Sequence, residues 1–165
     1  MRRSAAVLLG LALLLGGCGG AGIRVIAAQG VRLTVPAGWQ AVSPASAGPV
    51  TDPRTLLVVG TAGVHPKASH CEIAAYRIPA EAAVVVVIGW TTVAAGGRPT
   101  PPGRAPLKAL VAVRRPSFEC FAGRGAVAQV LFGGSLYQVN VLVGERCPAR
   151  RVRQALAVAR SFDRA

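Results

Sequence analysis

Short runs of alternating or continuous apolar residues recur along the chain and predict a fold made mainly of β-strands. Residues 31–35 alternate apolar and polar positions, which places Val31, Leu33 and Val35 on one face of a half-buried strand. Residues 84–88 are an unbroken run of Val and Ile, typical of a central strand that is covered on both faces. The predicted strands are 31–35, 56–59, 71–78, 84–88, 125–132 and 136–143.

Proline, glycine and serine mark where these strands end. Residues 36–39 (Pro-Ala-Gly-Trp) break the first strand, and 43–53 is a loop rich in Pro, Ser, Ala and Gly. Residues 65–70 have turn chemistry, and the four prolines within 96–106 exclude helix and central strand. Gly133-Gly134 accepts the positive φ angles of a tight hairpin turn between the last two strands.

The chain closes with a predicted amphipathic helix over 148–162. Apolar residues spaced by four, three and three form one stripe, and Pro148 suits a first helical turn. The stripe consists of Val152, Leu156, Ala159 and Phe162. We therefore expect an α+β domain that consists of a mainly antiparallel β-sheet with this C-terminal helix packed on one face. The other face of the sheet would be covered by a short helix at 79–83 or by loops.

The N-terminal segment has a different pattern. Arg2-Arg3 precedes an apolar stretch from residue 5 to 15, which ends in Leu15-Gly16-Gly17-Cys18. This motif resembles the lipobox of bacterial lipoproteins, in which diacylglycerol is attached to the cysteine sulfur before cleavage. The resemblance implies that Cys18 is the lipidated first residue of the mature protein, although Gly16 stands where Ala or Ser is more usual.

Two other interpretations of this segment are an ordinary secretory signal and a membrane-spanning helix. The apolar stretch is shorter than the ~20 residues that a bilayer core requires. We therefore divide the chain into a signal peptide (1–17), a lipidated N-terminus and tether (18–30) and one domain (31–165). The expected location is the extracytoplasmic face of the cell membrane.

The mature chain is strongly basic. Removal of residues 1–17 leaves 17 basic and 6 acidic residues, a formal charge of +11 carried almost entirely by arginine. Such a charge suits nucleic acid, anionic lipid or a wall polymer, and the exported location disfavours nucleic acid. Arginine, Ala, Gly, Val and Pro together are also typical of GC-rich genomes such as those of actinobacteria, which explains the charge without any anion site.

Three cysteines remain if Cys18 is acylated, so an oxidising compartment allows one disulfide and one leftover thiol. We expect the pair Cys71–Cys120, because both lie in predicted strands near turns. Cys147 stands before the predicted helix. A helix N-terminus with Arg146 and Arg150 nearby would lower its pKa and produce a reactive thiol. We favour the other interpretation, a partly buried helix-cap residue left unpaired.

Catalytic and metal-binding patterns are weak. The chain has two histidines and lacks a Gly-x-Ser-x-Gly elbow, so no hydrolase triad is indicated. Neighbouring residues of a strand point to opposite faces, which argues against a His70–Cys71 nucleophile pair. His65, His70, Cys71 and Glu72 match no strong zinc spacing, and we expect neither metal nor cofactor.

The arginines of the last helix are the candidate contacts to anionic lipid or a wall polymer. They lie mostly away from the apolar stripe, and each charge near an anionic membrane is worth ~1 kcal/mol. A solvated helix face is the alternative. The residues are Arg146, Arg150, Arg153 and Arg160, with Arg164 just beyond them.

A second resemblance involves the two ends of the domain. Residues 31–39, a strand leading into Pro-x-Gly-Trp, and residues 137–162, a hairpin strand and helix closing with Ser161-Phe162, resemble PsbP-like or LpqN-like domains of bacterial lipoproteins. The middle, 51–125, departs from that pattern. The resemblance implies a domain that binds or scaffolds, and we expect this function rather than catalysis; the alternative is an envelope enzyme with its cleft near 96–106.

Overall fold

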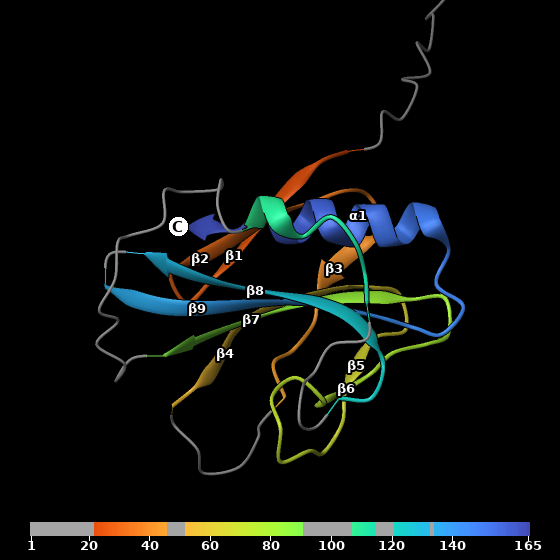
Figure 1. Ribbon diagram of the computed structural model, residues 1–165, viewed down its shortest axis with the longest axis horizontal. Helices are drawn as coiled ribbons and strands as arrows, with labels where there is room; N and C mark the ends of the chain where they lie inside the picture. The colour runs from red at the N-terminus through yellow and green to blue at the C-terminus, as the bar shows by residue number, and fades with distance from the viewer. Residues whose placement is uncertain (1–21, 46–51, 91–106, 115–120, 133) are drawn as a thin grey trace, which may run out of the picture.

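The computed structural model describes residues 22–45, 52–90, 107–114, 121–132 and 134–165, and Figure 1 shows how they are arranged. A five-stranded sheet is the main element, and every neighbouring pair of its strands is antiparallel. In spatial order its strands are β3 (Trp39–Ala41), β4 (Arg54–Thr61), β7 (Ala83–Trp90), β9 (Ser135–Val143) and β8 (Arg124–Phe132).

Smaller elements complete the fold. A three-stranded sheet contains β1 (Arg24–Ala28), β2 (Val31–Val35) and β10 (Asp163–Arg164), again antiparallel. The remaining elements are β5 (His65–Pro66) paired with β6 (Tyr76–Arg77), the short 3-10 helix η1 (Leu107–Ala109) and the helix α1 (Ala149–Arg160). The expected α+β class, mainly antiparallel with a C-terminal helix packed on the sheet, is confirmed. None of the helices within the described ranges is long and apolar enough to cross a bilayer.

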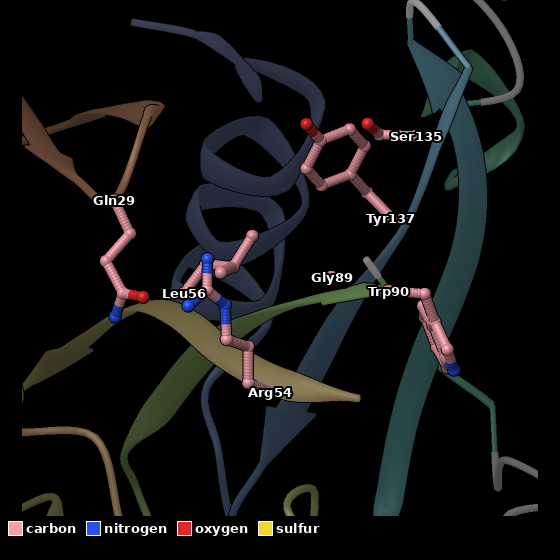
Figure 2. A pocket seen from close by; sticks show the side chains of 7 residues that line it. All are labelled: Gln29, Arg54, Leu56, Gly89, Trp90, Ser135 and Tyr137. Atoms are coloured by element: carbon pink, nitrogen blue, oxygen red, sulfur yellow. The ribbon is translucent and has the colours of Figure 1, made fainter. Parts of the chain in front are cut away.

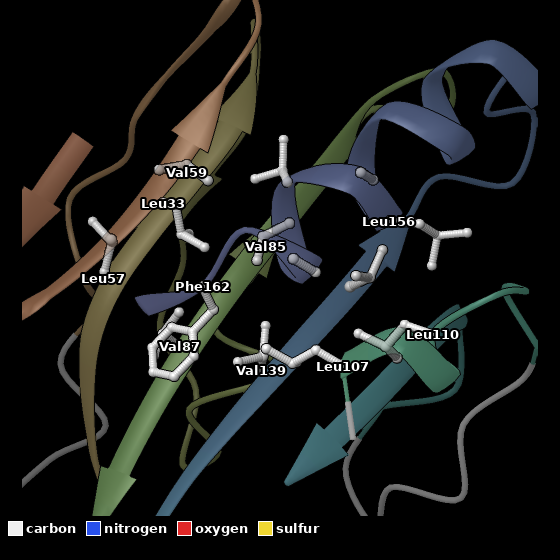
Figure 3. Close-up of a cluster of buried hydrophobic side chains, with 14 of the residues drawn as sticks. Leu33, Leu57, Val59, Val85, Val87, Leu107, Leu110, Val139, Leu156 and Phe162 are labelled. Carbon is white, nitrogen blue, oxygen red and sulfur yellow. The ribbon is translucent and has the colours of Figure 1, made fainter. Parts of the chain in front are cut away.

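The central strand β7 separates two hydrophobic cores, which explains its unbroken apolar sequence. Val85 and Val87 face the first core, beneath α1, and Val84 and Val86 face the second. Figure 3 shows the first core, where Leu156 of α1 lies above side chains of the sheet. A strand with packing on both faces has no solvent side on which polar residues would be favoured.

The second core is covered by loops rather than by a helix at 79–83. Residues 79–82 form one turn, in which the Ala82 amide donates to the Pro79 carbonyl at 2.9 Å, and the chain then enters β7 at Ala83. The four residues available are too few for a helix before the β-branched run begins. Val42, Val64 and Tyr76 supply the covering side chains.

The predicted strand over 71–78 is also wrong for most of its length, because only Tyr76–Arg77 is extended. The Cys71 amide donates to the Ser69 hydroxyl at 3.1 Å, and residues 71–74 form a bend and turns. A serine side chain that accepts a bond from the backbone two residues on competes with a strand ladder. Cys71 therefore lies in a turn and not in a strand.

The C-terminal helix is shorter than predicted but presents the expected face. Pro148 is its N-cap, and Leu156 and Ala159 are buried in the first core. Phe162 lies beyond the helix end and is still completely buried. The Thr34 amide of β2 donates to the Ser161 hydroxyl at 2.8 Å, so the first and last parts of the domain are joined directly.

The hairpin predicted near the end of the chain is present as β8 and β9. Phe132 pairs with Ser135, and Gly134 has a φ of 82°, a left-handed conformation that suits glycine. One further hairpin was not predicted, because β1 is mostly exposed and shows no alternation. Its residues lie within the segment 18–30 that we expected to act as a tether.

Candidate functional site

A cavity of about 260 Å³ lies at the end of the five-stranded sheet where β4 begins, β7 ends and β9 begins (Figure 2). It lies on the face of the sheet that carries the first core, since Leu56 and Tyr137 belong to that core. The residues that line it are Gln29, Arg54, Leu56, Gly89, Trp90, Ser135 and Tyr137.

The register of the sheet brings three of these residues into one row. Arg54 pairs with Gly89, and Gly89 pairs with Tyr137 on its other side. Directly paired residues project from the same face, and neighbouring strands are ~4.8 Å apart, so Arg54 and Tyr137 flank Gly89 with their backbones about 10 Å from each other. Because glycine has no side chain, the surface of the sheet between Arg54 and Tyr137 forms a depression at Gly89.

A β-bulge shapes the floor of the cavity. The register of β4 shifts between Thr55 and Leu57, which turns both Leu56 and Leu57 toward the first core. Leu56 leans over the strand below it, and a Cβ built on Gly89 would lie 2.6 Å from its Cδ1. Glycine at position 89 lets the end of the Leu56 side chain approach β7 closely, and a larger residue there would make that end shift.

The β1–β2 turn contributes Gln29. Gln29 has a φ of 47° and Gly30 a φ of 76°, and the two residues form a two-residue hairpin turn between Ala28 and Val31. The Gln29 amide nitrogen Nε2 donates to the Thr55 carbonyl at 3.3 Å, which ties this turn to the start of β4.

Hydrogen-bond donors surround the cavity. Figure 2 shows Gln29 and Arg54 on one side and the hydroxyls of Ser135 and Tyr137 on the other. The Arg54 side chain is exposed and makes no hydrogen bond or ion pair within the described part of the chain. None of the described residues that line the cavity is a glutamate or an aspartate. The arrangement is suited to an anionic group, since a guanidinium, an amide and two hydroxyls can all donate to it.

Tyr137 is held in place by aromatic packing. Its ring centroid lies 5.4 Å from that of Phe162 and 6.2 Å from that of Phe132. Phe162, just beyond the C-terminal helix, and Phe132 of β8 thus support one wall of the cavity.

The two described cysteines differ in their bonding state. Cys71 takes part in a disulfide and Cys147 is free, so the pairings that involve Cys147 do not form. Cys18 and Cys120 lie outside the described residues, and the predicted pairing of Cys71 with Cys120 stays a prediction. Because Cys71 has no thiol in this state, it cannot act as a nucleophile or as a thiolate ligand.

Cys147 precedes the helix as predicted, and its burial decides between the two interpretations of its thiol. Burial raises the pKa of its thiol, and the positive charges of Arg151 and Arg124 oppose that shift without overcoming it. The arginines that act on it, Arg151 and Arg124, are not the predicted Arg146 and Arg150. The raised pKa argues against a reactive thiol and agrees with the favoured interpretation, a buried cysteine left unpaired.

The residues considered for a metal site are dispersed. His65 lies in β5 and His70 is exposed, while Glu72 accepts a hydrogen bond from the Thr55 hydroxyl. Burial raises the pKa of the Glu72 carboxyl, and a hydrogen bond from the Thr55 backbone amide lowers it less. Across the described ranges, no three His, Cys, Asp or Glu side chains gather in a way that could hold a metal ion.

The predicted anion-contact arginines differ in their availability. Arg146, Arg150 and Arg153 are exposed, as is Arg164. Arg160 is half-buried and donates to the Leu110 carbonyl, which ties the helix to the segment after η1. Of the predicted set, Arg160 therefore has a structural role.

Sequence reasoning missed the cavity residues Gln29, Arg54, Ser135 and Tyr137. Two signals were available in the sequence. Gln29-Gly30 directly before a strand is a turn dipeptide, and an isolated glycine such as Gly89 at the end of an apolar strand indicates a bulge or a close approach. Neither signal reveals which residues the sheet register brings together. The cleft expected near 96–106 lies outside the described residues.

Comparisons of the chain with models of protein families, with curated proteins and with solved structures found no match, so its assignment depends on the geometry of this site.

Proposed function

We propose that this protein is an exported lipoprotein of the cell envelope that acts as a binding module. The observation that carries the binding function is the cavity at the end of the sheet, where an apolar floor is surrounded by an amide, two hydroxyls and the Arg54 guanidinium, which has no partner among the described residues. Ligand sites commonly combine apolar walls with a few convergent polar groups. The signal-like N-terminus supports the location.

The anchor is Cys18, acylated on its sulfur. Each buried methylene contributes ~0.8 kcal/mol, so a diacylglycerol holds the protein on the membrane permanently. Ile23 lies five residues after Cys18, and a fully extended chain of that length spans at most about 17 Å. Ile23 and Val25 are 74% and 61% exposed. The domain is thus held near the bilayer with two apolar side chains free to touch it.

Lipidation is tested on the full chain expressed in a host that processes lipoproteins. We expect an intact mass that corresponds to cleavage before residue 18 plus an acyl adduct, and recovery in the membrane fraction. Cys18→Ser removes the sulfur and should abolish the adduct. A wild-type protein without any acyl mass at its N-terminus would overturn the anchor.

A second candidate function is binding to an anionic surface. It is favoured by the exposed guanidinium groups of Arg150 and Arg153, which lie one helical turn apart on α1. Flotation of the mature, unlipidated chain with phosphatidylglycerol vesicles tests it.

The double variant Arg150→Gln/Arg153→Gln should bind these vesicles more weakly than the charge-matched control Lys67→Gln/Arg77→Gln, whose residues are exposed elsewhere. Added salt should release the wild type. Equal binding by the two double variants would exclude the helix face as the contact.

A further inference from the structure

The β1–β2 turn carries backbone strain at the wall of the cavity. Within the described ranges, Gln29 is the one non-glycine residue with a positive φ. A left-handed conformation is unfavourable for a residue with a Cβ, and glycine or asparagine would adopt it more readily. Residues with strained backbone conformations are common at ligand sites, where the surrounding structure holds them in position for binding. At this position of the turn, Gln29 supplies a side-chain amide to the wall of the cavity, which a glycine could not do.

The polar groups of the cavity are all able to donate, and most have no partner. Arg54, Ser135 and Tyr137 make no side-chain hydrogen bond in the part of the chain that the structure describes. Five N–H groups of a guanidinium and two hydroxyls are therefore available to one ligand. An oxyanion accepts such bonds, and charge-assisted bonds to it are about twice as strong as neutral ones.

The size and the floor of the cavity limit the rest of the ligand. A volume of about 260 Å³ corresponds to roughly nine water molecules in the liquid. Leu56 and Gly89 form an apolar floor, whereas the Trp90 side chain turns away from it and packs against the second core. A compact apolar body, such as one aromatic ring, fits this space.

We propose that the cavity binds a small organic oxyanion, with the anionic group on Arg54 and the two hydroxyls and a compact apolar body on Leu56. This inference rests on the proposed binding function and names the chemical class of its ligand. Gln29 closes the wall between the turn and β4. One Nε2 hydrogen of its amide donates to the Thr55 carbonyl, and the second hydrogen is free to donate to the ligand. Both a carboxylate and a phosphate monoester satisfy this chemistry.

The test uses the full chain in detergent micelles and ligand-observed NMR with four probes. Benzoate and phenyl phosphate carry the two anionic groups, benzyl alcohol is the neutral counterpart, and acetate is the anionic group without the ring. We expect benzoate or phenyl phosphate to bind at least tenfold more tightly than benzyl alcohol and acetate. A preference for benzoate indicates a carboxylate ligand and a preference for phenyl phosphate a phosphate monoester, and either supports the proposal.

Three variants locate the binding. Arg54→Gln should weaken binding of the preferred probe at least tenfold, whereas Arg77→Gln, an exposed arginine of β6, should leave it unchanged. Gln29→Gly keeps the turn conformation and removes the amide. It should weaken binding while the thermal midpoint of the protein stays equal to that of the wild type or rises.

Three results would overturn the inference: neither anionic probe binds, benzyl alcohol binds as tightly as the anions, or Arg54→Gln binds like the wild type. The acyl mass at Cys18 is measured on the same preparation. A chain that is acylated but binds no probe refutes the ligand class and leaves the membrane anchor intact. A chain that binds the probes without an acyl mass refutes the anchor alone.

Discussion

Phe162 is the residue whose truncation best tests how the end of the chain stabilises the domain. It lies just past α1, is completely buried, and its ring centroid is 5.7 Å from that of Phe132 and 5.4 Å from that of Tyr137. Replacing a buried phenylalanine by alanine costs ~3–5 kcal/mol, a range that includes the loss of ring contacts worth ~0.5–1.5 kcal/mol each. We expect Phe162→Ala to lose about 4 kcal/mol of unfolding free energy.

Such a loss is a large fraction of the ~5–15 kcal/mol by which domains are stable, so the variant should fold but be marginal. Urea unfolding followed by tryptophan fluorescence measures it, since Trp39 is 1% exposed in the native state. With a slope of ~2 kcal/mol per molar urea, the midpoint should fall by about 2 M.

The control is Phe162→Leu, which keeps an apolar side chain in the core and should cost about 1.5 kcal/mol. If Phe162→Ala loses less than that amount with an unchanged slope, Phe162 is not packed between the sheet and the helix, and the reasoning is refuted.

Three further predictions concern single residues. Iodoacetamide should label Cys147 at neutral pH at least about tenfold more slowly in the native protein than in urea, because the thiol is buried and its pKa is raised; equal rates would contradict the burial. The raised pKa of Glu72 means that the folded state holds its proton more tightly, so wild-type stability should decline as pH rises from the ordinary value of 4.5 through the folded pKa. Thermal melts at pH 4 and pH 7 should show a fall in the midpoint of the wild type that is absent or smaller in Glu72→Gln. The same change of midpoint with pH in both proteins would contradict this prediction. Gly144→Ala should lower the urea midpoint by the equivalent of ~1–3 kcal/mol, because a Cβ there lies 2.1 Å from the Pro79 carbonyl oxygen; an unchanged midpoint would show that the backbone yields freely.

Elements with a strong local pattern were predicted well. Residues 31–35 alternate because one face packs in the first core, and 84–88 do not alternate because both faces are covered. The final helix followed from its spacing. Segments without such a pattern failed: β1 has almost no buried side, and at 71–78 the hydrogen bond between Ser69 and Cys71 replaces a strand.

The cavity could not be predicted from the sequence, because its residues come from four separate segments. Arg54, Gly89 and Tyr137 are far apart along the chain and meet only through the register of three strands. A shift of one residue in either pairing would send their side chains to opposite faces. The direction of the Cys147 pKa could not be decided from the sequence for a related reason, since burial depends on what the fold places around the thiol.

By itself, then, the sequence determined the class of fold, the central strand, the last hairpin, the C-terminal helix and the signal-like start of the chain. These features depend on patterns within a few consecutive residues, which report directly on which side of an element is buried. The tertiary structure alone decided which side chains surround the cavity, which arginines remain free and which cysteine stays a thiol. Those properties depend on contacts between distant segments, and no local pattern encodes the register that creates them.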